Sequence, residues 1–247
     1  MLFRSYSRDY EILAKGNILL KNNFSSIKIS EKKTQTINDI WNEEFEKNRS
    51  IFNDQVLCFT NFFKKANDVH VNVFFTDYRN VIAERKLPTL QLNIRQVGVS
   101  GLTIVHENKQ KYVIFALRSK NNMEYPEYLE LVPSGNIDKS VLQNEDSVNY
   151  IQKLKEEFVE ETGTFTGNIK KVYSFCLVYD KIHQVFDVGC IIELEYTLTD
   201  LINNFQKVNE YSNPMFVKEI ELNEFINNNK EKIVPTSLAL LECYLNN

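Results

Sequence analysis

The scarcity of glycine is the feature that most restricts what this chain can fold into. The chain holds seven glycines in 247 residues, about 3% where roughly 7% is usual. Dinucleotide-binding folds and P-loop enzymes hold phosphates on glycine-rich turns, with the spacings G-x-G-x-x-G and G-x-x-x-x-G-K-[ST]. The sequence argues against both folds because neither spacing occurs among its glycines, which are Gly16, Gly98, Gly101, Gly135, Gly163, Gly167 and Gly189.

The rest of the composition indicates a soluble globular protein with an uneven charge. Hydrophobic residues make up 43% of the chain, charged residues 25% and aromatic residues 12%, which is typical of a domain with a substantial core. Residues 1–94 hold 14 Lys and Arg against 11 Asp and Glu, a net charge of +3, so residues 95–247 carry −7. The acidic second part argues against a nucleic-acid partner and is compatible with a cation site.

The sequence also predicts a cytoplasmic protein with reduced cysteines. The first residues, Met1–Asp9, become charged too early for a signal peptide. No apolar run approaches the roughly 20 residues that a membrane helix needs, so no membrane partner is expected. Free core thiols are indicated because the cysteines form no C-x-x-C pair and lie in apolar stretches, at Cys58, Cys176, Cys190 and Cys243.

Hydrophobic periodicity divides the chain into an N-terminal lobe, residues 1–94, and a second domain, residues 95–247. In the lobe we expect a hairpin that turns near Gly16, a helix over 36–45 and strands near 55–60 and 69–75. The second domain alternates strands with helices and predicts an α/β fold. Its expected helices lie at 146–162, 199–205, 223–226 and 235–245, and its longer strands at 97–105, 111–118, 170–179, 185–196 and 216–222.

Three carboxylates share one face at the end of the helix predicted over residues 146–162. Glu157, Glu160 and Glu161 are spaced i, i+3 and i+4 and therefore lie on the same side, while Leu154 and Phe158 point into the core. Each like-charge pair at this spacing costs a few tenths of a kcal/mol. A hard divalent cation such as Mg²⁺ relieves that repulsion because it prefers carboxylate oxygens. A solvated acidic face is the alternative interpretation of this fragment alone.

The surroundings of the three carboxylates favour a metal site. A buried strand leads into the loop Val132–Gly135, and Gly163 ends the helix shortly after the last carboxylate. This loop can bring the backbone carbonyl of Gly135 close to the same metal. The order of strand, loop, amphipathic helix and glycine stop is difficult to obtain by accident.

The carboxylates and glycines described above resemble the signature of the Nudix hydrolases. This signature is G-x5-E-x7-R-E-U-x-E-E-x-G-U, with U an aliphatic residue. Residues Glu157–Gly163 match the E-U-x-E-E-x-G part with Phe at U, and Glu130–Gly135 resembles the strand and loop that open the signature. The interval from Gly135 to the first matching carboxylate is longer than in the signature, and Glu156 stands where the signature has Arg. The resemblance covers roughly residues 96–220 and implies a Nudix-type α/β/α sandwich around a mixed sheet, with an additional N-terminal lobe.

The same resemblance implies an enzyme. Glu157, Glu160 and Glu161 would be its catalytic carboxylates and would bind Mg²⁺ or Mn²⁺ together with the carbonyl of Gly135. A water activated by metal and carboxylate would attack one phosphorus of a nucleoside diphosphate linked to another moiety, which makes the protein a hydrolase of diphosphate (phosphoric anhydride) bonds. The expected partner is a small-molecule nucleotide diphosphate, and by analogy the N-terminal lobe would support a homodimer.

A narrower resemblance concerns the substrate. Five segments are similar to the UDP-glucose-type Nudix subgroup: Ile40–Trp41, Ile51–Asp54, Phe74–Arg79, Gly98–Gly101 and Phe115–Ser119. This implies that a UDP-sugar is split into UMP and a sugar 1-phosphate. The alternatives are ADP-ribose, another dinucleotide or a prenyl diphosphate as substrate, or a Nudix-fold nucleotide-binding or regulatory module without catalysis.

Three residues are candidate substrate contacts. Arg118 ends a predicted strand and can clamp phosphate oxygens through charge-assisted hydrogen bonds, although a surface Arg without a ligand fits equally well. Tyr78 and Arg79 can contact base or phosphate, or they can pack the lobe against the second domain.

Overall fold

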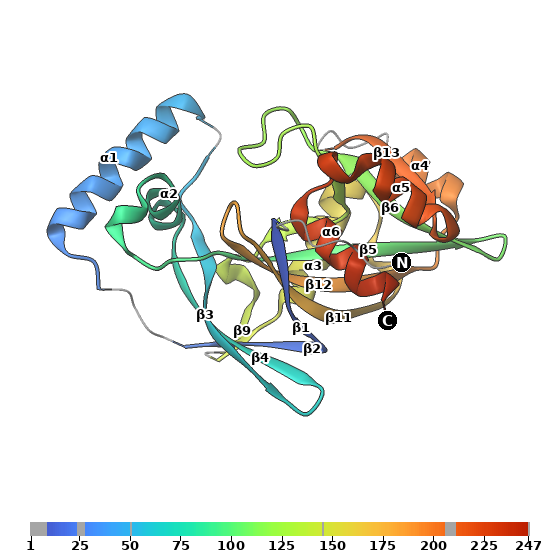
Figure 1. Cartoon of the computed structure of the whole chain (residues 1–247), viewed down its shortest axis with the longest axis horizontal. Coiled ribbons are helices and arrows are strands. Elements are labelled where there is room, and N and C mark those ends of the chain that lie inside the picture. The colour runs from blue at the N-terminus through green and yellow to red at the C-terminus, as the bar shows by residue number, and fades with distance from the viewer. Residues whose placement is uncertain (1–8, 24–27, 50, 145, 206–210, 247) are drawn as a thin grey trace.

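The computed structural model describes residues 9–23, 28–49, 51–144, 146–205 and 211–246. In this part of the chain the strands form two mixed sheets, and helices pack around them (Figure 1). The larger sheet has the spatial order β1 (Tyr10–Lys15), β11 (Ile169–Asp180), β12 (Val185–Leu194), β5 (Val97–Glu107), β6 (Gln110–Leu117) and β13 (Ser212–Lys218). Two short strands extend it, because β7 (Leu129–Leu131) pairs with β6 and β8 (Ser134–Asn136) pairs with β5.

The smaller sheet has the order β3 (Gln55–Lys65), β4 (Asp68–Asp77), β2 (Asn17–Asn22), β10 (Ser147–Val148) and β9 (Leu142–Asn144). Each sheet is mixed because it contains a parallel pair, β5 with β12 in the larger sheet and β2 with β4 in the smaller one. The expected α/β class with a mixed sheet is therefore confirmed.

Helices cover both faces of the larger sheet. The helices are α1 (Glu31–Lys47), α2 (Tyr78–Lys86), α3 (Tyr150–Thr162), α4 (Leu198–Phe205), α5 (Leu222–Asn229) and α6 (Pro235–Leu245). One core joins α3 and α4 to the Val97, Val99 and Val188 side of the sheet, and a second core joins α5 and α6 to the opposite side. This arrangement is an α/β/α sandwich. Short 3-10 helices occur at Pro88–Leu90, Lys139–Val141, Thr166–Asn168, Glu219–Glu221 and Lys230–Lys232.

The N-terminal region reaches into both sheets. The expected hairpin near Gly16 is wrong, because β1 pairs with β11 in the larger sheet while β2 pairs with β4 in the smaller one. The amide of Gly16 donates to the carbonyl of Phe175, and the next amide, Asn17, donates to the carbonyl of Asn67. Gly16 has φ of +139°, so it passes the chain from one sheet to the other where a side chain would be strained.

Strand pairing also joins the two predicted parts of the chain in the smaller sheet, since β10, from residues 95–247, pairs with β2, from residues 1–94. The division into 1–94 and 95–247 stays a prediction. Figure 1 shows α1 and α2 at one end of the molecule and α4, α5 and α6 at the other. Within residues 1–94, helices α1 and α2 and strands β2, β3 and β4 thus lie outside the larger sheet.

Helix α3 begins later than the sequence suggested. The predicted start at residue 146 is wrong, because the side chain of Asn149 caps the helix by accepting from the amide of Gln152 at 3.2 Å. The reason is that Val148, which lies in the predicted helical range, belongs to β10 and is buried there. The other end agrees with the prediction, because Gly163 takes the left-handed conformation with φ of +66°.

Two further expectations concern the core and the membrane. All four cysteines are buried and free, as predicted. Leu154 and Phe158 of α3 are fully buried, which confirms the predicted apolar stripe of this helix. None of the helices in the described ranges is long and apolar enough to cross a membrane.

Candidate functional site

A strongly acidic cavity of about 190 Å³ lies where β5 and β12 begin. Five carboxylates line it, against the single guanidinium of Arg118; they belong to Glu124, Glu130, Glu161, Asp180 and Asp187. Strand β8 supplies Ser134, Gly135 and Asn136. Small-molecule pockets are commonly about 300–1,000 Å³, so this cavity suits an ion or one small group, and a larger ligand must extend beyond it.

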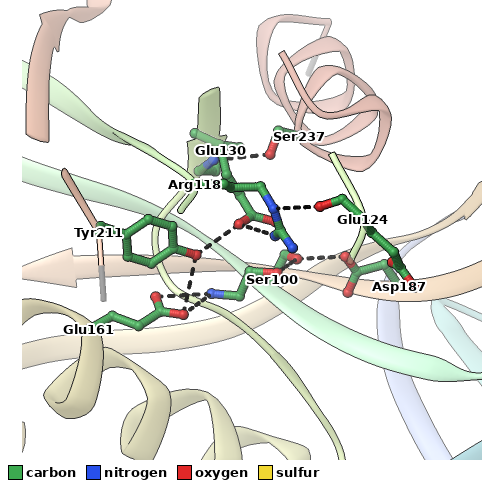
Figure 2. Close-up of polar contacts among 10 residues, drawn as sticks. Ser100, Arg118, Glu124, Glu130, Glu161, Asp187, Tyr211 and Ser237 are labelled. Carbon is green, nitrogen blue, oxygen red and sulfur yellow. Dashed lines mark hydrogen bonds and ion pairs between the residues drawn. The ribbon is translucent and has the colours of Figure 1, made fainter. Parts of the chain in front are cut away.

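Glu161 is the predicted carboxylate that faces the cavity. It is 1% exposed at the end of α3 and accepts hydrogen bonds from the amide of Ser134 at 3.2 and 3.3 Å. The hydroxyl of Tyr211 donates to the same carboxylate at 3.3 Å, as Figure 2 shows. These bonds fix the orientation of the side chain, because charge-assisted bonds are stronger than neutral ones.

Glu157 meets the predicted glycine loop. It lies so close to Gly135 that a methyl group on that glycine would overlap its carboxylate. Lys153, one turn earlier, forms an ion pair with Glu157 at 2.9 Å and with Asp138 at 3.2 Å. The structure therefore brings Gly135 and Glu157 together, and their ligation of a metal stays a prediction.

Glu160 lies elsewhere on the same helix. Its side chain is exposed to solvent and does not line the cavity. Among the described residues no group of three or more His, Cys, Asp or Glu side chains is placed to hold a metal ion. Two of the three predicted carboxylates thus converge on the Ser134–Gly135 segment, and the third faces outward.

Arg118 lies in the cavity wall, but its charge is engaged by protein groups. Its guanidinium forms an ion pair with Glu130, which is 3% exposed, and its Nε donates to the carbonyl of Glu124 at 3.2 Å. Tyr211 also donates to Glu130, at 2.8 Å. Burial and the charges of Glu130 and Glu161 raise the pKa of Tyr211 well above its usual value, so it remains a donor. A phosphate at Arg118 would have to compete with Glu130.

Asp187 is a site residue that the sequence reasoning missed. It is 5% exposed on β12, and the hydroxyl of Ser100 donates to its Oδ2 at 2.5 Å. Its other oxygen, Oδ1, is buried and has no hydrogen-bond partner among the described residues. Burial, with the charges of Glu130 and Asp180, raises the pKa of Asp187 to about 8. A single Asp inside the apolar run Val185–Ile192 was the available signal.

Asp180 borders the cavity from the end of β11 and is fully bonded. Tyr125 donates its hydroxyl to Oδ2 at 2.8 Å, and the amides of Ile182 and His183 donate to Oδ1. Burial raises its pKa, against the hydrogen bonds that lower it. Both oxygens of Asp180 thus accept hydrogen bonds, from Tyr125 and from the turn after β11, whereas Oδ1 of Asp187 accepts none from the described residues.

Tyr78 and Arg79 lie at the start of α2, outside the cavity lining. Tyr78 packs edge-on against Trp41 with ring centroids 6.4 Å apart, and Arg79 pairs with Asp77 at 2.9 Å and donates to Asn38 at 3.1 Å. The structure does not bring them to Glu161 or Arg118. Their role as substrate contacts stays a prediction.

The residues around the cavity fit a hard divalent cation by chemistry. The candidate ligand atoms are carboxylate and carbonyl oxygens, which Mg²⁺ and Mn²⁺ prefer over nitrogen and sulfur. The buried Oδ1 of Asp187 is an acceptor that lacks a protein partner, and such a group is costly unless something binds it. Glu161, Asp187 and Gly135 line the cavity and could contact such an ion, while Glu157, which does not line it, stays a predicted ligand.

Comparison with known proteins gives a likeness in fold only. No protein-family model and no curated protein sequence matches the chain. The NUDIX domain of Shewanella oneidensis NrtR, complexed with ADP ribose, is similar with a TM-score of 0.44 and 14% identity over 62% of this chain and 87% of that chain. DR0079 from Deinococcus radiodurans has a TM-score of 0.42 and 12% identity over 60% and 82% of the two chains.

A third similar structure is a C. elegans Ap4A hydrolase binary complex, with a TM-score of 0.41 and 12% identity over 61% of this chain and 97% of that chain. At these TM-scores and identities the likeness establishes neither family nor activity. The functional argument therefore rests on the residues of this chain.

Proposed function

We propose that this protein is a Mg²⁺- or Mn²⁺-dependent hydrolase that cleaves the diphosphate of a nucleoside diphosphate linked to another moiety. The observation that supports it is that Glu157 and Glu161 of α3 both contact the Ser134–Gly135 segment, and that Glu161 and this segment line an acidic cavity. These residues belong to the segment that resembles the Nudix signature. A UDP-sugar, split into UMP and a sugar 1-phosphate, is the proposed substrate.

The chain's own groups have distinct tasks in this proposal. A bound divalent cation would neutralise diphosphate charge and lower the pKa of water. Glu161 is held toward the cavity by Ser134 and Tyr211, so its orientation is set before any ligand arrives. Arg118 is held in place by Glu130 and by the carbonyl of Glu124, and it presents a positively charged guanidinium in the cavity wall.

A panel of diphosphates tests the proposal. UDP-sugars, ADP-ribose, dinucleoside polyphosphates and a prenyl diphosphate are incubated with Mg²⁺ or Mn²⁺, and the products are identified by mass spectrometry. We expect UMP and sugar 1-phosphate, with turnover lost in Glu161→Gln and Glu160→Gln. Glu224→Gln, an exposed carboxylate on α5, is the control that should retain turnover. Unchanged rates in both helix variants would contradict the assignment of these carboxylates.

A nucleotide-binding module without catalysis is the second candidate. The outward position of Glu160, and the lack of a three-carboxylate cluster in the described residues, favour it. Calorimetric titration of UDP-sugar with and without Mg²⁺ distinguishes the two functions. Equal affinity in both titrations, without turnover in any condition, would support the module over the enzyme.

A further inference from the structure

Two of the four cysteines share one core, beneath helix α6. Cys176 of β11 and Cys243 of α6 both lie in the core on the α5 and α6 side of the larger sheet. Cys190 belongs to the core on the opposite side of that sheet, and Cys58 belongs to a third core against α1 and α2. Because all four side chains are buried, packed residues separate the cysteines of different cores. The packing therefore leaves Cys176 and Cys243 as one pair.

The thiol of Cys176 lies directly beneath α6. Residue 176 pairs with Gly189 of β12, and a Cβ on that glycine would lie 2.6 Å from Sγ of Cys176 and 3.0 Å from Cγ of Leu240 in α6. The absence of a side chain at Gly189 thus leaves the room that this sulfur occupies under the helix. Cys243 follows Leu240 by three residues, so the two side chains lie on the same face of α6. That face is turned toward the sulfur of Cys176.

The two thiols are hydrogen-bonded to each other. This hydrogen bond is the main reason that the pKa of Cys243 is lowered, against the effect of burial, and the charge of Lys15 adds to the lowering. Burial, with the same hydrogen bond, raises the pKa of Cys176 well above its usual value. Cys176 is therefore the donor and keeps its proton, whereas Cys243 reaches the thiolate form more readily. The thiolate is the form of cysteine that reacts with an oxidant.

The surroundings of Cys243 favour such a reaction. Lys15 of β1 pairs in the sheet with Cys176, and its Nζ donates to the backbone carbonyl of Cys243 at 3.5 Å. Its positive charge thus lies beside the residue that would carry the thiolate. Cys243 also belongs to the last turn of α6, which ends at Leu245. Helix ends fray more readily than helix interiors, and fraying of this turn would admit a small oxidant.

We propose that Cys176 and Cys243 form a reversible disulfide when the protein meets hydrogen peroxide. The thiolate of Cys243 attacks one peroxide oxygen, the O–O bond breaks, and the products are a sulfenic acid and hydroxide, which takes up a proton to become water. The sulfur of Cys176 then attacks the sulfenic sulfur, and the departing hydroxide takes the Cys176 proton as a second water. Two thiols lose two electrons, and the peroxide is reduced to water. This inference is independent of the proposed hydrolase function.

The cross-link would hold α6 to the larger sheet at both ends of the helix. At its start, Val234 and Thr236 line the acidic cavity, and the hydroxyl of Ser237 accepts from the amide of Leu131 at 3.0 Å. At its other end, the disulfide would join α6 to β11. The part of the cavity wall that α6 supplies would therefore be fixed more firmly in the oxidised protein.

Treatment of the folded full chain with hydrogen peroxide tests the inference. The free thiols, counted after denaturation, should fall from four to two, with a mass loss of two hydrogen atoms. Peptide mapping should identify one cross-link, between Cys176 and Cys243, and dithiothreitol should restore the lost thiols. The midpoint of thermal unfolding should rise by roughly 10 °C, because the disulfide closes a long loop in the unfolded chain.

Four cysteine variants provide the controls and the order of the steps. Cys190→Ala is the matched control because residue 190 is also 0% exposed, and it should form the same cross-link, as should Cys58→Ala. Cys176→Ala should stop at the sulfenic acid of Cys243, which dimedone labels. Cys243→Ala should give neither cross-link nor label. Circular dichroism checks each fold, and the peptide map of the wild type carries the test if a core variant is unstable.

Several outcomes would overturn the inference. These are an unchanged thiol count in the wild type, a cross-link that includes Cys58 or Cys190, and a cross-link between two chains. A lower midpoint of thermal unfolding after oxidation would show that the disulfide does not fit the native structure. None of these measurements uses a substrate, so failure of every diphosphate in the hydrolysis panel would contradict the proposed function and leave this result intact.

Discussion

Glu44 and Asp187 are two buried carboxylates with opposite surroundings. Glu44, in α1, is 7% exposed and pairs with Lys47 at 2.9 Å and Lys86 at 3.0 Å. The hydrogen bond from Lys47 is the main reason that its pKa is lowered, and Lys86 adds to the effect. Asp187 is buried to a similar degree, but it has only a serine hydroxyl as a side-chain donor, and its pKa is raised to about 8.

The difference separates a structural ion pair from a candidate site. Lys47 of α1 and Lys86 of α2 both pair with Glu44 and so link the two helices, which means that ion pairs within the fold neutralise the charge of Glu44. The charges around Asp187 are mostly carboxylates, and one of its oxygens remains unused in the described structure. An acidic group that burial destabilises and the fold does not compensate is a candidate functional group.

The largest expected effect is a pH-dependent loss of stability caused by Asp187 in metal-free protein. Its folded pKa of about 8 lies above the unfolded value of 3.8, so the folded state holds the proton more tightly between these values. The free energy of unfolding should fall as pH rises from about 4 to 8, by up to about 5 kcal/mol relative to Asp187→Asn. Urea unfolding of both proteins with chelator, at several pH values, measures it. Parallel pH profiles would show that Asp187 is compensated by another group.

The next effect concerns Glu130, the cavity carboxylate that does have a cation. Arg118→Met would leave Glu130 buried without its guanidinium, and breaking such a buried pair costs about 3–5 kcal/mol. Urea unfolding at pH 7 measures this loss. Tyr211→Phe removes only a hydroxyl from the same carboxylate and should cost about 1 kcal/mol. Equal losses in the two variants would mean that the ion pair contributes no more than a neutral hydrogen bond.

The smallest effect is expected at Glu44, with the opposite dependence on pH. Lys47 and Lys86 are 57% and 49% exposed, so solvent screens the pairs and Glu44→Gln should cost about 1 kcal/mol at pH 7. The folded pKa lies below the usual 4.5, so this contribution is present above pH 4.5 and is lost as pH falls through the folded value. Thermal unfolding at pH 7 and pH 3 measures it. If the stability difference between the wild type and Glu44→Gln were larger at pH 3 than at pH 7, ionised Glu44 would not be the stabilising form.

The sequence predicted the local features of α3 well and its beginning poorly. The spacing of Leu154 and Phe158 gave the buried stripe, and Gly163 gave the end of the helix, because both depend on residues within a few positions of each other. The start was misplaced because Val148 pairs with β9, a partner that helical periodicity does not reveal.

The candidate site was predicted in part for the same reason. Glu157, Glu161 and Gly135 were identified by a local motif, and the structure brings them together. The outward position of Glu160 depends on how α3 rotates against the sheet. Tyr78 and Arg79 were placed near the substrate by resemblance, but α2 packs them beside α1.

By itself, the sequence determined the fold class, the carboxylate helix with its glycine stop, and the exclusion of glycine-rich phosphate cradles. Only the tertiary structure decided which carboxylates share a cavity. Asp187 reaches Ser100 and Gly98 through the parallel pairing of β12 with β5, residues that are far apart in the chain. Sheet register brings together groups that no local pattern connects, and burial then determines whether each group is compensated or left to bind a ligand.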